Sequence, residues 1–143
     1  MVDHEDVAPK FKEAMIAKAK EKIPYWKLLG MEVVDMKKGW AKIRVPFSRK
    51  LTNANGKLHG GVIFSAADSA TAIAVVGAVS RDAFLTTIEM KINYLKPIDD
   101  GEIIAEAKII HQGSQTAIGD IEVKDATGEL VAKALSTYAI VKK

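Results

Sequence analysis

The sequence predicts an α+β protein in which an antiparallel sheet of about five or six strands wraps around a long central helix. The segment 60–79 has no proline and is rich in alanine, and it is long enough for about five helical turns. Segments on both sides alternate apolar and polar residues, which is typical of half-buried strands. The turns that separate these strands are short, as in antiparallel sheets. A helix with such small side chains can lie close to the sheet and cover its apolar face.

The length and composition fit one domain. The chain has 143 residues, of which 48% are hydrophobic, so it can bury a core of its own. We expect a single domain over residues 1–143, with an N-terminal helical extension over about residues 1–30. No internal repeat or low-complexity tract interrupts it.

Composition also bears on several classes of site and partner. The chain has no cysteine, which excludes disulfides and thiol nucleophiles. The net charge is only +3 and the charges are interspersed, so we expect no nucleic-acid partner. Asp68 interrupts the one long apolar run, and the N-terminus lacks a signal-peptide core, so we expect a cytoplasmic protein without a membrane partner. His4 and His111 are isolated, so no metal site is expected.

The N-terminal part is expected to cover the sheet or the mouth of a pocket. Residues 8–21 carry an apolar stripe that includes Phe11, Met15 and Ala19, which predicts a helix that Pro24 ends. Residues 25–30 are read as a short apolar turn, with Gly30 as a helix C-cap. A helix that lies on a membrane surface is the alternative for this segment.

The remaining elements are expected in a simple order. A hairpin of strands 31–36 and 40–47 comes first, followed by a loop over 48–58 and the helix over 60–79. Four strands follow as an antiparallel meander, at 84–95, 102–111, 116–124 and 129–141. In the first of these four, alternation puts Ile88, Met90, Ile92 and Tyr94 on one face and Thr87, Glu89, Lys91 and Asn93 on the other.

The start of the long helix is a candidate binding site. A loop with two asparagines and three glycines leads directly into this helix. A helix start has free backbone N–H groups and a partial positive charge. The adjacent Gly60 and Gly61 would let a ligand oxygen approach those N–H groups closely. The other interpretation is steric, in which the glycines only permit a tight junction.

Asp68 is an unexpected residue on the apolar part of this helix. A buried carboxylate is costly without a partner, so it either has a function or bonds Ser65, Ser69 or a partner chain. It lies roughly 13 Å along the helix from His59, at 1.5 Å per residue. If both residues act on one acyl carbonyl, two chains are expected to share the site across a dimer interface.

These residues form a pattern found in a known family. The order and spacing of Asn53, the triplet His59-Gly60-Gly61 and Asp68 resemble those of hotdog-fold acyl-CoA thioesterases, specifically the phenylacetate-pathway type and its mitochondrial relatives. The segment 87–97 looks like the family's next strand. The resemblance covers roughly residues 28–141, and it implies the hotdog fold.

The resemblance also implies an activity and a set of site residues. The expected reaction is hydrolysis of acyl-CoA to the free acid and CoA, with the carbonyl oxygen on the Gly60 N–H and with Asp68 as base or nucleophile. His59 would contact the substrate or hold the loop, and Asn53 would position water or cap the loop. Thr87 falls where the family often has a Ser or Thr that helps hold the attacking water, although it is also simply a good strand residue.

Further residues are expected to contact the substrate. Gly61, Leu58, Phe64 and Ser65 are assigned to substrate binding, with Trp26 and Leu29 as further candidates for the acyl pocket. Lys91, Arg81 and Lys108 are candidates for the CoA phosphates. No cofactor is expected, since CoA is part of the substrate. A homodimer that forms the site, itself paired into a homotetramer, is the expected assembly.

Two other functions stay open at this point. One is a hotdog hydratase or dehydratase that acts on acyl thioesters, and the other is an acyl-CoA-binding module without catalysis. The sequence leaves the acyl group open between aromatic and aliphatic types.

Overall fold

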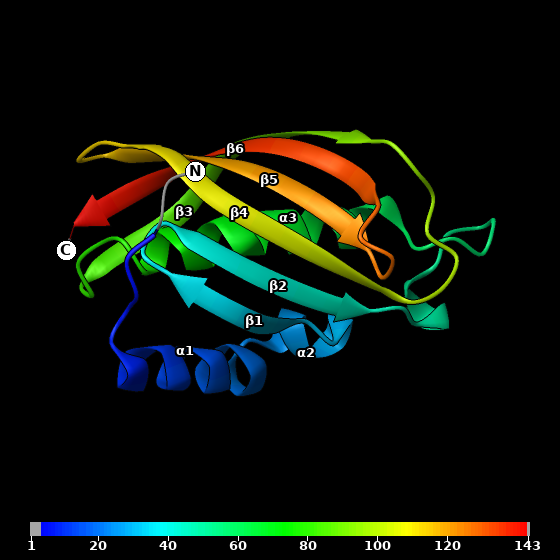
Figure 1. Ribbon diagram of the computed structural model, residues 1–143, viewed down its shortest axis with the longest axis horizontal. Coiled ribbons are helices and arrows are strands. Elements are labelled where there is room, and N and C mark those ends of the chain that lie inside the picture. The colour runs from blue at the N-terminus through cyan, green and yellow to red at the C-terminus, as the bar shows by residue number, and fades with distance from the viewer. Residues whose placement is uncertain (1–3, 143) are drawn as a thin grey trace.

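The computed structural model describes residues 4–142, in which a six-stranded sheet wraps around one helix, α3 (Figure 1). Residues 1–3 and 143 of the predicted domain lie outside the described part. The helices and strands are α1 (Pro9–Lys22), α2 (Pro24–Leu29), β1 (Glu32–Lys37), β2 (Trp40–Pro46), α3 (Gly60–Val76), β3 (Ala83–Tyr94), β4 (Glu102–Gln112), β5 (Thr116–Asp125) and β6 (Leu130–Lys142), with one 3-10 turn at Arg49–Leu51.

The strand order is β1-β2-β4-β5-β6-β3, and every neighbouring pair is antiparallel. Strands β4, β5 and β6 form the predicted meander. The prediction was wrong for β3, which pairs with β6 instead of β4. The long α3 carries the chain from β2 to the opposite edge of the sheet, so β4 returns to pair beside β2.

Helix α3 fills the concave side of the sheet because its inward side chains are small. Ala66, Ala67, Ala70 and Ala74 are fully buried, and apolar side chains of the sheet pack around them. A hydrogen bond of 2.9 Å from Ser136 Oγ to Thr71 Oγ1 satisfies the buried polar pair between β6 and the helix. The helix ends at Val76, three residues before the predicted end, with Gly77 as its C-cap.

The N-terminal helices lie beside β1 at the edge of the sheet opposite β3 (Figure 1). An ion pair joins Lys12 to Asp35, and Ala19, Trp26 and Leu29 are buried. The segment predicted as a turn is the short helix α2. Gly30 ends it in the left-handed conformation, with φ of 71°, as the predicted C-cap.

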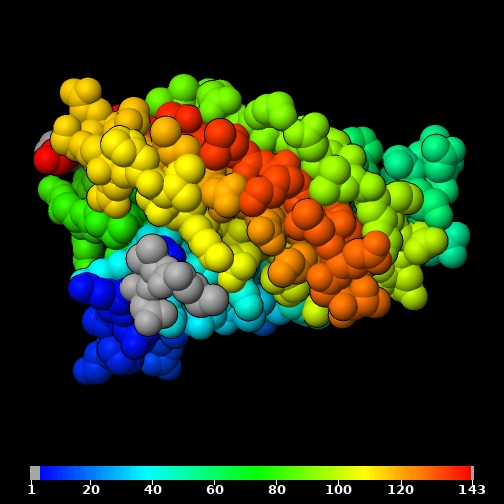
Figure 2. Space-filling model, turned by 45° about the horizontal axis from the view of Figure 1, so that its top comes forward, coloured from blue at the N-terminus to red at the C-terminus, as the bar shows by residue number. Residues whose placement is uncertain are grey.

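Strand β3 forms an open edge of the sheet in the described chain. It bonds β6 on one side only, and Figure 2 shows it in yellow-green along the upper rim. Phe84, Ile88 and Leu95, on or just after this strand, are each more than half exposed. A bulge at Ile88 shifts the register between Thr87 and Glu89.

Candidate functional site

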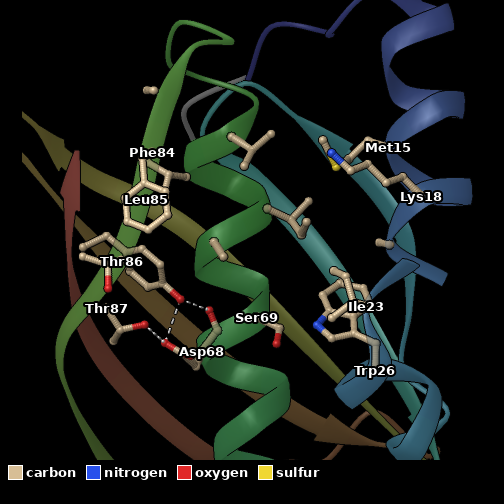
Figure 3. A pocket seen from close by; sticks show the side chains of 16 residues that line it. Met15, Lys18, Ile23, Trp26, Asp68, Ser69, Phe84, Leu85, Thr86 and Thr87 are labelled. Carbon is tan, nitrogen blue, oxygen red and sulfur yellow. Dashed lines mark hydrogen bonds between the residues drawn. The ribbon is translucent and has the colours of Figure 1, made fainter. Parts of the chain in front are cut away.

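Asp68 and the start of α3 open into two different cavities of the same chain. The first, here called the Asp68 cavity, has a volume of about 500 Å³ and lies over α3 between β3 and the N-terminal helices (Figure 3). The second, the Gly60 cavity, has a volume of about 440 Å³ and lies between the start of α3 and the end of β3. The two cavities share no lining residue.

Asp68 bonds two hydroxyl groups of the neighbouring strands (Figure 3). Its Oδ1 accepts hydrogen bonds from Thr87 Oγ1 at 2.9 Å and from the Tyr138 hydroxyl at 2.8 Å. Burial raises the pKa of Tyr138, and the Asp68 charge raises it further, so the phenol stays protonated and donates. No hydrogen bond to Asp68 Oδ2 occurs within residues 4–142. The carboxylate is thus held at one oxygen, beside a cavity that its side chain lines.

The serines expected to bond Asp68 have other roles. Ser65 Oγ donates to the Gly61 carbonyl oxygen at 2.8 Å and lies 2.7 Å from the Tyr25 hydroxyl. Ser69 lines the Asp68 cavity. The alternative in which Asp68 only bonds Ser65 or Ser69 therefore does not hold, because its partners come from β3 and β6.

The bulge at Ile88 explains how Thr87 reaches Asp68. Unbroken alternation puts Thr87 on the opposite face from Met90 and Ile92, which pack against the core. The extra residue changes the phase of the strand, so that Thr87 faces α3 together with them. The predicted face assignment of Thr87 was wrong, and its part in the site stays a prediction.

His59 caps the helix whose first residue is Gly60. Its Nδ1 accepts the Gly61 N–H at 2.8 Å, and a Cβ on Gly61 would lie only 3.0 Å from that atom. A ring nitrogen that accepts carries no proton, so the proton of the neutral ring is on Nε2. Nε2 is therefore a donor available to a ligand.

The cap distinguishes the two glycines. The Gly61 N–H is already bonded, whereas the Gly60 N–H makes no hydrogen bond to any part of the chain that the structure describes. The Gly60 carbonyl accepts from the Tyr94 hydroxyl at 2.9 Å, which fixes the first turn of α3 to β3. Of the two N–H groups considered for the substrate oxygen, only that of Gly60 is free to bind one.

Asn53 shapes the loop before the helix. Its Oδ1 accepts from the backbone N–H of Asn55 at 2.9 Å and of Lys57 at 3.2 Å, as in an Asx turn. The same residue lines the Gly60 cavity. Asn53 therefore has the loop-capping role and also lies where a ligand at Gly60 would be in reach.

The predicted apolar contacts are divided between the two cavities. Trp26 lines the Asp68 cavity and Leu58 lines the Gly60 cavity. Leu29 is buried in the core and Phe64 is 37% exposed on α3, and neither lines either cavity. Sequence reasoning missed Met15 and Ile23, although the apolar stripe of the N-terminal helix already contained Met15.

The expected phosphate-binding residues are not gathered at one site. Lys91 donates to Asn93 Oδ1 at 2.7 Å on β3, Arg81 lies over the Phe11 ring at 4.1 Å, and Lys108 is exposed on β4.

Two lysines that were not predicted line the Gly60 cavity. Lys57 pairs with Asp99. Lys96 pairs with Asp125 and Glu129, which raise the pKa of Lys96 to about 12. In the sequence, only the nearness of these two lysines to the predicted site residues could have indicated them.

Residues 4–142 hold no cluster of three or more His, Asp or Glu side chains suited to a metal ion. Across the same residues, no helix has the length and apolar character needed to cross a membrane.

Comparison with known proteins identifies the family of this chain. The family model of the thioesterase superfamily matches residues 55–132, more than half of the chain. A 1,4-dihydroxy-2-naphthoyl-CoA hydrolase of Listeria monocytogenes is 30% identical over 115 residues, which cover 80% of this chain and 94% of the relative. The acyl-coenzyme A thioesterase PaaI of Escherichia coli is 32% identical over 107 residues and 74% of each chain.

A solved structure gives the same result for the fold. The structure of the E. coli PaaI protein, from the phenylacetic acid degradation operon, superposes with a TM-score of 0.82 at 27% identity. The match covers 94% of this chain and 96% of that one. Together with the six-stranded sheet and its central helix, this match confirms the predicted α+β hotdog fold.

Proposed function

Because this chain belongs to the thioesterase superfamily and is a thioester hydrolase of the acyl-CoA type, we propose that two subunits share each of its active sites. In this proposal the Gly60 N–H of one subunit holds the thioester carbonyl oxygen. Asp68 of the other subunit delivers the attack on the carbonyl carbon.

The free Gly60 N–H supports the first half of the proposal. It lies at the positive end of a helix of 17 residues, and a carbonyl oxygen that becomes an oxyanion is stabilised by such a donor. The His59 Nε2–H is a second donor at the same helix start. Lys57 and Lys96 also line this cavity, although each is already paired with carboxylates of the same chain.

The two separate cavities support a site made by two chains. One acyl carbonyl cannot bond Gly60 and also meet Asp68 about two helical turns further along the same α3. A second copy that pairs along the open edge of β3 would cover Phe84, Ile88 and Leu95 and bring another α3 alongside. A homodimer is therefore the proposed catalytic unit, and the expected homotetramer would contain two of them.

The observation that carries the proposal is the way in which Asp68 is held. Thr87 and Tyr138 occupy Oδ1, so Oδ2 is left for water or substrate. A carboxylate in this position can take a proton from a water whose oxygen then bonds the carbonyl carbon. It can also bond that carbon itself, giving an anhydride that water later opens. In both routes the C–S bond breaks and the CoA thiolate leaves.

A panel of aromatic and aliphatic acyl-CoAs tests the function, with a thiol-reactive dye to detect free CoA. Wild-type protein should release CoA, and Asp68→Asn should lower kcat by at least about 100-fold while the protein melts within a few degrees of wild type. Its amide oxygen can still accept both hydroxyl bonds, which protects the fold.

Other outcomes separate the remaining functions. A change in enoyl absorbance without release of CoA would indicate a hydratase or dehydratase. Binding without turnover would indicate a binding module. If Asp68→Asn keeps full activity, the carboxylate has been assigned the wrong role.

A further inference from the structure

We infer that Tyr138 is a positioning residue, which aims the Asp68 carboxylate at the reacting carbonyl. This inference rests on the proposed function, since it concerns the residue given the attacking role there. Tyr138 lies near the C-terminal end of the chain on β6, outside the loop and helix that hold the sequence motif, and only 4% of its surface is exposed.

The Tyr138 hydroxyl contacts Asp68 at two points. It lies 2.8 Å from Oδ1 and 2.9 Å from the backbone carbonyl oxygen of the same residue. The terminal χ2 torsion of an aspartate, which rotates the carboxylate, is only loosely restricted unless the carboxylate oxygens are bonded. Contacts at both ends of Asp68 fix the rotation of this side chain relative to its own backbone.

The two donors form one rigid unit with the sheet. Tyr138 and Thr87 are direct partners in the β3–β6 register, so both hydroxyls reach Oδ1 from adjacent positions. Strand β6 is bonded on both sides, by β5 and β3, which leaves it little freedom. Oδ1 is consequently held by the sheet, and Oδ2 is presented to the Asp68 cavity.

Packing alone does not require the hydroxyl. A phenylalanine would fill the same apolar surroundings, which include Val75, Ala117 and Ile140, without a polar atom to satisfy. A buried hydroxyl is costly unless it is bonded, and here its partner is the one carboxylate of α3. The polar atom of Tyr138 therefore serves Asp68.

Tyr138→Phe tests this role, because it removes one oxygen and keeps the ring. We expect kcat to fall about tenfold while KM stays within about twofold, since attack is misaligned but binding is not.

The matched control is Thr137→Val, at the residue of β6 that directly precedes Tyr138. It removes a hydroxyl bond of 2.9 Å to the carboxylate of Glu89 across the same strand pair, away from both cavities. This variant should keep the wild-type kcat and KM. A comparable loss in both variants would mean that β3–β6 stability accounts for the effect, and it would overturn the inference.

A double variant separates positioning from other effects of Tyr138→Phe. In the Asp68→Asn background, Tyr138→Phe should cause no further fall in kcat, because its effect passes through the carboxylate. An additional tenfold loss there would refute the inference, as would an unchanged kcat in the single variant. If the wild type releases no CoA from any acyl-CoA, the proposed function itself has failed, which is a different result from either.

Discussion

At the scale of single residues, the cap at the start of α3 gives two neighbouring glycines backbone N–H groups that differ in their hydrogen bonding. His59 bonds the Gly61 N–H, so the Gly60 N–H remains as the proposed donor for a carbonyl oxygen. Gly60 is the first residue of the helix, and His59 before it is extended, with φ of −61° and ψ of 134°. Proline tolerates the first helical position and favours an extended residue before it.

This geometry allows the Gly60 N–H to be removed with little other change. Gly60→Pro should lower kcat by about 100-fold or more, the usual effect of losing an oxyanion donor. Gly60→Ala is the matched control because it keeps the N–H. In both variants the new Cβ would lie about 3.2 Å from the Tyr94 ring, which is half exposed and can shift. Steady-state kinetics of the two variants should show the larger loss of kcat in Gly60→Pro. Equal kcat values in Gly60→Pro and Gly60→Ala would rule out this N–H as the donor.

The sequence predicted the residue types of the site better than their contacts. The motif identified Asp68, His59 and Gly60 because these residues follow one another in a loop and a helix. It could not identify Tyr138, whose strand is brought to Asp68 only by the pairing of β6 with β3. One signal was available, since Tyr138 falls on the buried face of its strand and a buried tyrosine hydroxyl needs a partner.

At the scale of elements, the N-terminal helices form one wall of the Asp68 cavity. Met15 and Ile23 line it together with Trp26, opposite Phe84 and Leu85 of β3 (Figure 3). Apart from Lys18, the side chains of this wall are apolar, and they face the space beside the proposed attacking group. The size of its side chains should therefore affect which acyl groups fit.

Met15→Ala enlarges this space and tests the assignment. The ratio of kcat/KM for longer over shorter acyl-CoAs should rise by about fivefold or more, because a pocket of this kind discriminates by methylene groups. Ile16→Ala is the control, because Ile16 also packs on the core but does not line this cavity. An equal shift in the control would show that the effect comes from a loosened helix.

Local patterns predicted most of the elements but not the sheet order. Alternation located all six strands within a few residues, since it depends only on neighbouring positions. The position of β3 at the edge depends on the path of the chain after α3, and the bulge at Ile88 depends on packing against that helix. Neither the edge position of β3 nor the bulge changes the alternation of apolar and polar residues. The predicted meander and the predicted face of Thr87 were therefore both wrong.

At the scale of the whole molecule, the proposed mechanism makes each chain half of an active site. The proposed attacking carboxylate and the proposed carbonyl-binding N–H lie in separate cavities, and the open strand β3 offers an edge for a second copy. Two different lesions, each inactive in its own homodimer, should then complement one another in a mixed dimer. A mixed dimer has one site with both lesions and one intact site.

Co-expression of Asp68→Asn with Gly60→Pro at equal levels is the most direct test of this shared site. Half of the dimers formed at random are mixed, and each has one intact site of two, so the preparation should show about a quarter of the wild-type activity. The two variants expressed separately should be nearly inactive. If the co-expressed preparation is as inactive as the single variants, both groups act within one chain, and the two-subunit mechanism is contradicted.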